Sequence, residues 1–144
     1  MSFQNPGLEE RRDILVNAKT IAVVGLSDNP YRASYMISQA MQQSGYRIIP
    51  VNPSITEALG EKAVPSLTDI EEPVDVINVF RRSEHIMPIA EDAVKYGKCK
   101  IFWLQSGIYN EEAANYLKQH GFTVIMDQCI KVDHAILVRP NKNR

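Results

Sequence analysis

Residues 25–34 combine the backbone freedom and the side chains that a phosphate-binding loop needs. Gly25 lets the backbone turn sharply as it leaves the apolar run before it, and Ser27 supplies a small hydroxyl group. The helix expected after this loop presents unpaired N–H groups and the positive end of its dipole to whatever lies above it. Arg32 can add a charge-assisted contact to a phosphate. These features together suit a pyrophosphate, and the alternative is a tight strand-to-helix turn that holds no ligand.

This loop matches only the first position of the glycine fingerprint of dinucleotide-binding proteins. The fingerprint Gly-x-Gly-x-x-Gly needs three glycines, and its positions here hold Gly25, Ser27 and Pro30. An NAD site also usually has an acid at the end of the second strand, which binds the ribose 2′-hydroxyl. This chain has Asn52 and Pro53 there. The missing carboxylate argues against NAD and removes a repulsion toward a phosphorylated ribose, such as that of coenzyme A (CoA). The alternative at Asn52-Pro53 is a plain turn.

Two further apolar runs end in residues that could face the same ligand. Arg81 and Arg82 follow the third run and precede an expected helix, so both could face an anion or both could be solvated. Gln105 and Gly107 follow the fourth run. An amide both donates and accepts hydrogen bonds, and a glycine permits close backbone approach. The alternative here is again an ordinary turn.

Catalytic and metal-binding residues are harder to assemble from this sequence, and we predict neither a catalytic residue nor a metal site. The three histidines have no metal-ligand spacing with the cysteines; they are His85, His120 and His134. Cys129 follows the last apolar run, but a nucleophilic thiol needs a depressed pKa and a nearby base. His134 is near Cys129 in sequence only, and we expect the lone acids Asp127 and Asp133 to be surface groups.

Apolar periodicity predicts strands that alternate with helices from one end of the chain to the other. Compact apolar runs predict strands over residues 20–25, 46–51, 74–80, 100–104 and 122–126. Helical spacing predicts helices over residues 8–18, 32–44, 83–97, 110–121 and 130–138. Alternation of this kind gives an α/β, Rossmann-like domain whose mostly parallel, five- or six-stranded sheet carries helices on both faces. The carboxyl ends of its strands meet at one edge, where open α/β sheets bind ligands.

Local patterns refine these elements. Leu8, Leu15 and Ala18 should form the buried face of the first helix. Residues 57–65 should be a loop with a short extended piece at residues 62–64. Residues 66–69 resemble a capping box that opens one helical turn. Residues 110–112 resemble the start of a helix, with a cap residue and two carboxylates. Ser83 should cap the helix that follows it.

Composition and charge narrow the class of protein. The 144 residues are 44% hydrophobic and 23% charged, a balance that suits one globular domain over residues 1–144, with its core at about residues 13–137. The net charge of −1 argues against a nucleic-acid partner, and the apolar runs are too short to span a membrane. The first residues show no signal-peptide pattern, and two cysteines, Cys99 and Cys129, make no disulfide framework. We therefore expect a cytoplasmic protein.

Four runs in this order and at these spacings resemble the small stand-alone CoA-binding proteins of bacteria and archaea. They are Ile21-Ala22-Val23-Val24-Gly25-Leu26-Ser27, Pro50-Val51-Asn52-Pro53, Val74-Asp75-Val76-Ile77-Asn78-Val79-Phe80-Arg81 and Trp103-Leu104-Gln105-Ser106-Gly107. That family is similar to the N-terminal domain of the succinyl-CoA synthetase α subunit. The resemblance covers about residues 13–137, and its specificity comes from the set of runs and from no single one.

The resemblance implies a Rossmann-like fold that binds CoA at the carboxyl ends of its strands. It implies a set of ligand-binding positions, which are Gly25, Leu26, Ser27, Asn29, Arg32, Ser34, Asn52, Pro53, Phe80, Arg81, Gln105 and Gly107. In the synthetase the catalytic histidine lies in a second domain, so we do not expect the synthetase reaction here.

The leading hypothesis is therefore a protein that binds CoA or an acyl-CoA and has no catalytic machinery of its own. Two alternatives remain open. One is a nicotinamide-dependent or CoA-ester-processing enzyme that uses Cys129. The other is a regulatory module that reports CoA status to a protein partner.

Overall fold

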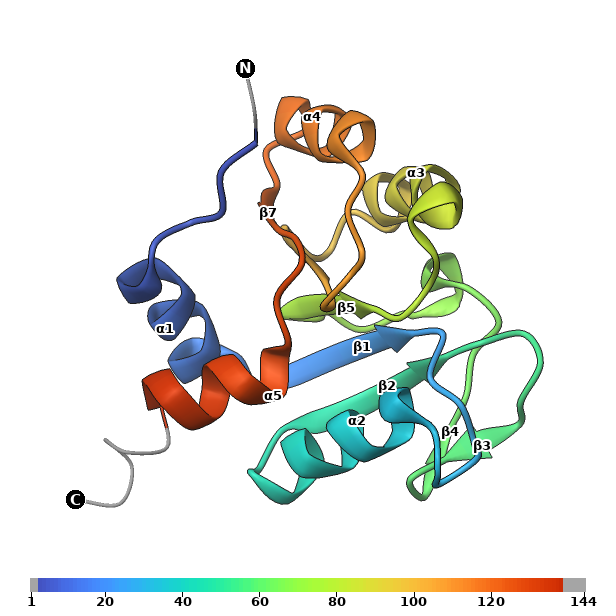
Figure 1. The fold of residues 1–144 in the computed structure, drawn as a ribbon. Helices are drawn as coiled ribbons and strands as arrows, with labels where there is room; N and C mark the ends of the chain where they lie inside the picture. Colours follow the sequence, from blue (N-terminus) through green and yellow to red (C-terminus); the bar gives the residue numbers. More distant parts are fainter. Residues whose placement is uncertain (1–2, 139–144) are drawn as a thin grey trace.

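Five parallel strands in the order β2-β1-β5-β6-β7 form the central sheet of the computed structural model, which describes residues 3–138 (Figure 1). The strands are β1 (Thr20–Val24), β2 (Arg47–Val51), β5 (Val76–Val79), β6 (Ile101–Leu104) and β7 (Thr123–Ile125). The predicted α/β, Rossmann-like class is confirmed, with five strands in the described sheet. The predicted extent of the domain includes residues 1–2 and 139–144, which lie outside the described residues.

Helices cover both faces of this sheet and divide its core in two (Figure 1). On one face lie α1 (Leu8–Asn17), α2 (Ala33–Gln43), and α5 (Ile130–Asp133) with the π-helical turn η3 (His134–Val138). On the other lie α3 (Ile86–Tyr96) and α4 (Glu111–Gln119). Successive strand residues enter opposite cores, as Ile21 and Ala22 do. The central strands are therefore apolar on both sides, which explains their unbroken apolar runs.

The strand order reverses direction between the neighbouring strands β1 and β5. From β1 the chain crosses to β2 at one edge, and it then returns to β5 on the other side of β1. The loops that leave the carboxyl ends of β1 and β5 therefore run in opposite directions. In open α/β sheets, such a switch point opens the crevice in which ligands bind.

Two predicted helix starts are confirmed by hydrogen bonds. The Asn110 Oδ1 accepts a hydrogen bond from the Ala113 backbone N–H at 2.9 Å and caps α4. The Ser66 and Asp69 side chains form a capping box around the short 3-10 turn η1 (Leu67–Asp69).

One local prediction is confirmed in part and another is wrong. The short extended piece expected at residues 62–64 is present, because Lys62 lies in a strand and Val64 pairs with Val51. The expected loop of residues 57–65 also includes an antiparallel hairpin of β3 (Glu57–Ala58) and β4 (Glu61–Lys62). Its two turn residues, Leu59 and Gly60, have φ of 55° and 77°, and a leucine gives no signal for such a turn. Ser83 does not cap a helix, because its Oγ accepts from the backbone N–H of Tyr109 at 3.0 Å, at the start of the 3-10 turn η2 (Ser83–His85).

The buried face of α1 also differs from the prediction. Leu15 is buried, but Leu8 is 60% exposed, and Arg11 takes the inward position. The Arg11 Nε donates to the Asp133 Oδ2 at 2.9 Å, and its Nη1 donates to the Pro6 carbonyl at 2.6 Å. The expectation that Asp133 is a surface group is therefore wrong. This buried ion pair joins the first helix of the chain to α5.

Replacing Arg11 with methionine tests how much this ion pair supports the fold. The substitution keeps most of the side-chain volume but leaves the buried Asp133 carboxylate without its cation. We expect the free energy of unfolding, measured by urea denaturation, to fall by about 3–5 kcal/mol. Arg12→Met is the matched control, because Arg12 lies 3.7 Å from Asp13 in a half-exposed pair, and its loss should cost less than about 1 kcal/mol. Equal effects of the two substitutions would contradict this interpretation.

Candidate functional site

Gly25 lies where the loops after β1 and β5 approach each other. Its φ is +85°, and its N–H donates to the Val51 carbonyl at 2.8 Å, which joins the ends of β1 and β2. A Cβ atom at this position would lie 2.5 Å from the Phe80 carbonyl oxygen and 3.0 Å from the Arg81 Cδ. Only glycine fits both the dihedral angle and the space.

The loop from Gly25 to the start of α2 is held in shape by its own polar side chains. The Ser34 Oγ accepts from the Ser27 N–H at 3.0 Å, and the Ser27 Oγ accepts from the Asn29 N–H at 3.0 Å. The Asn29 Oδ1 accepts from the Tyr31 N–H at 2.9 Å. These oxygens shape the loop, and a hydroxyl group that accepts one hydrogen bond can still donate its proton to an anion. Arg32 is exposed at the amino-terminal end of α2.

Leu26 and Asn52 connect this loop to the end of β2. The Leu26 side chain is completely buried in the core, so only its backbone can reach a ligand. Its carbonyl accepts from the Asn52 Nδ2 at 3.0 Å, and the Asn52 Oδ1 accepts from the Ser54 N–H at 2.9 Å. The Asn52 amide that replaces the acid of an NAD site thus holds two loops together.

A cavity of about 590 Å³ opens beside the loop that follows β5. It lies at the carboxyl ends of β5 and β6 and is lined by Ala33, Ile37, Phe80, Arg81, Arg82, Ser83, Glu84, Gln105, Ser106, Gly107, Ile108 and Cys129. The cavity brings together four of the predicted site residues, which are Phe80, Arg81, Gln105 and Gly107. A volume of this size falls in the usual range of small-molecule sites.

A second hollow of about 250 Å³ lies on the other side of Arg81. Pro53 and His85 are among the residues that line it, and Arg81 lines both hollows. Arg81, whose Cδ lies beside Gly25, is therefore the residue that the two hollows share. Both hollows lie at the carboxyl ends of the strands.

The sequence did not indicate several residues that line the two hollows. Ala33 and Ile37 lie one turn apart on α2, and Ile108 follows Gly107. The helical spacing of Ala33 and Ile37 is evident in the sequence, but it is equally typical of residues that pack only in a core. Which face of α2 meets the cavity is determined by the loop before it.

Gly107 and Asp127 connect the ends of β6 and β7. The Asp127 Oδ1 accepts from the Gly107 N–H at 2.7 Å, and the φ angles are 58° at Asp127 and 81° at Gly107. The carboxylate is exposed, as predicted, but it holds the Gly107 loop in place.

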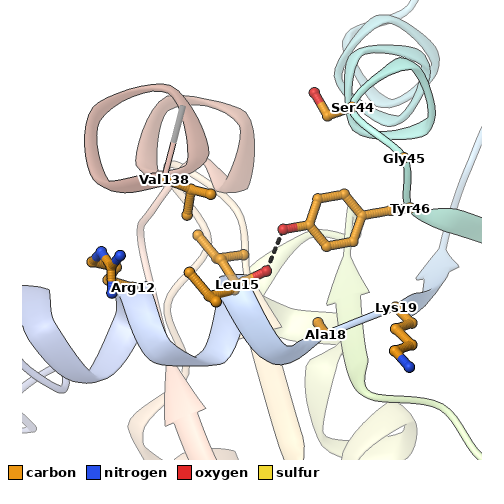
Figure 2. Close-up of a pocket in the computed structure, with 9 residues that line it drawn as sticks. Arg12, Leu15, Ala18, Lys19, Ser44, Gly45, Tyr46 and Val138 are labelled. Carbon is orange, nitrogen blue, oxygen red and sulfur yellow. Dashed lines mark hydrogen bonds between the residues drawn. The ribbon is translucent and has the colours of Figure 1, made fainter. Parts of the chain in front are cut away.

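A third hollow, of about 300 Å³, lies at the amino ends of the strands, away from the carboxyl edge (Figure 2). None of the predicted site residues lines it. The Tyr46 hydroxyl donates to the Leu15 carbonyl there, and burial raises the pKa of Tyr46, so it remains a neutral donor. The His134 ring packs edge-on against Tyr46, with the ring centroids 5.5 Å apart. His134 thus lies toward the amino ends of the strands, whereas Cys129 lies at their carboxyl ends.

Two structural findings concern metal ions and membranes. Among residues 3–138, no three or more His, Cys, Asp or Glu side chains gather in a group that could hold a metal ion. No helix in the described part of the chain is both long and apolar enough to cross a bilayer.

Comparison with known proteins identifies the family. The model of the CoA binding domain family matches residues 19–135, which include every predicted site residue. The chain belongs to this family. The matched residues contain all five strands of the sheet and every residue that lines the two hollows at its carboxyl edge.

Individual relatives agree with this family assignment. The chain is 56% identical over 134 residues to the uncharacterised protein YneT of Bacillus subtilis, covering 93% of this chain and 98% of YneT. The solved structure of the Thermus thermophilus protein ID.343 is 38% identical, with a TM-score of 0.87 and coverage of 92% of this chain and 99% of that one. The ADP-forming acetate–CoA ligase of Methanocaldococcus jannaschii is 22% identical over 121 residues, which are 79% of this chain but 17% of the ligase.

Replacing Gly25 with alanine tests the close approach at the centre of the site. Gly121→Ala is the matched control, because Gly121 has the same φ of +85° but a Cβ atom there would meet no atom of another segment within 4 Å. The control should lose about 1–2 kcal/mol of unfolding free energy from the dihedral strain alone. Gly25→Ala should lose a further amount of about 1–3 kcal/mol, because the Phe80 carbonyl must move. Equal losses in urea denaturation would show that the loops are not in close contact.

Proposed function

We propose that this protein binds CoA or an acyl-CoA along the carboxyl edge of its sheet, in the cytoplasm and without catalytic machinery of its own. The observation that carries the proposal is that Arg81, which lies beside Gly25, lines both hollows at the carboxyl edge of a member of the CoA binding domain family. CoA is a long molecule with a phosphorylated nucleotide at one end and a thiol at the other. Two hollows that share an arginine suit such a ligand.

The pyrophosphate of CoA would lie over residues 25–32, in front of the amino-terminal end of α2. Helix N–H groups without intrahelical partners favour an anion there. The Ser27 hydroxyl and the exposed Arg32 guanidinium add donors to this position. The loop needs no rearrangement to present them, since its own hydrogen bonds already hold its shape.

The two ends of the ligand would occupy the two hollows. The larger hollow has Ile37, Phe80 and Ile108 in its lining, with Arg81 and Arg82 beside them, which suits the pantetheine chain. The smaller hollow, with Pro53 and His85, would take the nucleotide. Arg81 lies between them, where it can contact the phosphates.

An enzyme that uses Cys129 needs a base beside this thiol. Of the described residues, no histidine lines the larger hollow, where Glu84 is the carboxylate in the lining, and His134 packs against Tyr46. The observations therefore favour binding over an acyl-transfer or nicotinamide-dependent reaction. A role in reporting CoA status to a partner is compatible with the same site.

Calorimetric titration with CoA, dephospho-CoA and NAD tests the proposed ligand. We expect CoA to bind most tightly of the three. Dephospho-CoA should bind about 10–100-fold more weakly, since one charged hydrogen bond contributes about 1.5–3 kcal/mol. NAD should bind weakest, because Asn52 offers no carboxylate to its ribose. Binding of NAD without binding of CoA would refute the proposal.

Ser27→Asp tests the position of the pyrophosphate. The new carboxylate can still accept the Asn29 N–H, so the melting temperature should change little. CoA binding in the same titration should be lost, because two negative charges would meet in the loop.

Asn115→Asp provides the control for Ser27→Asp. It adds the same charge on the exposed face of α4, and it should leave CoA affinity unchanged. Unchanged affinity in both variants would place the pyrophosphate elsewhere.

A further inference from the structure

Cys129 lies in the larger hollow at a position that two hydrogen bonds fix. It is a free, half-buried cysteine that lines the cavity of about 590 Å³. On one side, the Gln128 carbonyl accepts from the Nε1 of the buried Trp103 at 2.9 Å. On the other, the Ile130 N–H donates to the Gln105 Oε1 at 3.0 Å. The thiol between them therefore has a defined place in the wall of the cavity.

Gln105 indicates what kind of group the cavity holds beside this thiol. Its side chain lines the cavity and belongs to a residue that is only 3% exposed. The Ile130 N–H is a donor, so the Gln105 atom that faces it must be the acceptor oxygen Oε1. The other atom of the same amide group is therefore the donor nitrogen Nε2. Among the described residues, no acceptor pairs with Nε2. Nε2 is not among the fully buried atoms that lack a partner, so it keeps some exposure where Gln105 lines the cavity. A carbonyl group of a ligand in the cavity can accept its hydrogen bond.

The thiol end of CoA carries amide carbonyl groups, which Gln105 would bind, and a sulfur, which would lie near Cys129. If the pyrophosphate lies over residues 25–32, the pantetheine chain enters the larger hollow with its amide carbonyls and its terminal sulfur. Gln105 can donate to a carbonyl, and Cys129 lies in the same wall. The charged residues that line this hollow are Arg81, Arg82 and Glu84. Their net positive charge favours a ligand that carries phosphates.

We propose that Cys129 exchanges with the disulfide of CoA in this cavity and so forms a mixed disulfide between the protein and CoA; this inference rests on the proposed function. The Cys129 thiolate attacks one sulfur of the CoA disulfide, a new sulfur–sulfur bond forms, and the old one breaks. The second CoA leaves as a thiolate and takes up the proton that Cys129 has lost. Cys129 is oxidised, one CoA is reduced, and no other reactant is needed.

The second cysteine provides an internal control. Cys99 is buried on the other face of the sheet, and its Sγ contacts the Ile101 carbonyl at 3.5 Å. Burial raises the pKa of Cys99 to about 11, so it remains a protonated thiol near neutral pH. Because exchange requires a thiolate and access to the disulfide, Cys99 should not react.

Intact-mass measurement of the full chain after incubation with CoA disulfide tests the exchange. We expect one CoA adduct per chain, present in Cys99→Ser, absent in Cys129→Ser and removed by dithiothreitol. The rate should exceed that with hydroxyethyl disulfide by about ten-fold or more, because binding raises the local concentration of the reacting sulfur. In Ser27→Asp, which disrupts the pyrophosphate position, this advantage should be lost.

Calorimetry with reduced CoA separates failure of the exchange from failure of the proposed function. If the wild type binds reduced CoA but forms no adduct, or reacts no faster with CoA disulfide than with hydroxyethyl disulfide, the exchange is refuted and the binding function stands. An adduct that persists in Cys129→Ser also refutes the exchange at this residue. If the wild type does not bind reduced CoA, the proposed function itself fails.

Discussion

The approach of Gly25 to the Phe80 carbonyl is the close contact on which the centre of the carboxyl edge depends. The loops after β1 and β5 leave neighbouring strands in opposite directions, and they can do so at this distance only because residue 25 has no Cβ atom. The contact brings the Arg81 side chain against Gly25. Arg81 lines both hollows, so a side chain at Gly25 would crowd a residue that belongs to each of them.

Side-chain hydrogen bonds connect the end of each strand to its neighbour and keep the site formed without a ligand. Asn52 joins the second strand end to the first through the Leu26 carbonyl. Asp127 joins the last strand end to the Gly107 loop, and Gln105 joins the fourth strand end to α5. A loop that is already ordered loses less conformational entropy when a ligand binds, so more of the contact energy contributes to affinity.

The sequence predicted those features that depend on neighbouring residues or on the period of the apolar pattern. Buried strands such as residues 20–24 are evident because both faces are apolar, and the topology then indicates which loops meet. The burial of Arg11 could not be predicted, because its partner Asp133 lies 122 positions away. The same holds for Ser83, whose hydroxyl group is held by the Tyr109 N–H from another loop. Local propensity carries no information about such distant partners.

The buried ion pair of Arg11 and Asp133 helps to position the proposed ligand site, because Asp133 belongs to α5 and α5 follows directly after Cys129. Replacement of such a pair by apolar side chains often costs a protein no stability, so stability alone does not account for it. Its geometry is more restrictive than an apolar contact, because Arg11 contacts both the Asp133 carboxylate and the Pro6 carbonyl. The Asp133 N–H donates to the Cys129 carbonyl at 3.0 Å, one helical turn away from the cavity wall. An ion pair that fixes the position of Asp133 therefore also fixes how Cys129 is presented to the cavity. An apolar replacement could keep α5 folded and still let it shift along the sheet, which would separate the Ile130 N–H from Gln105.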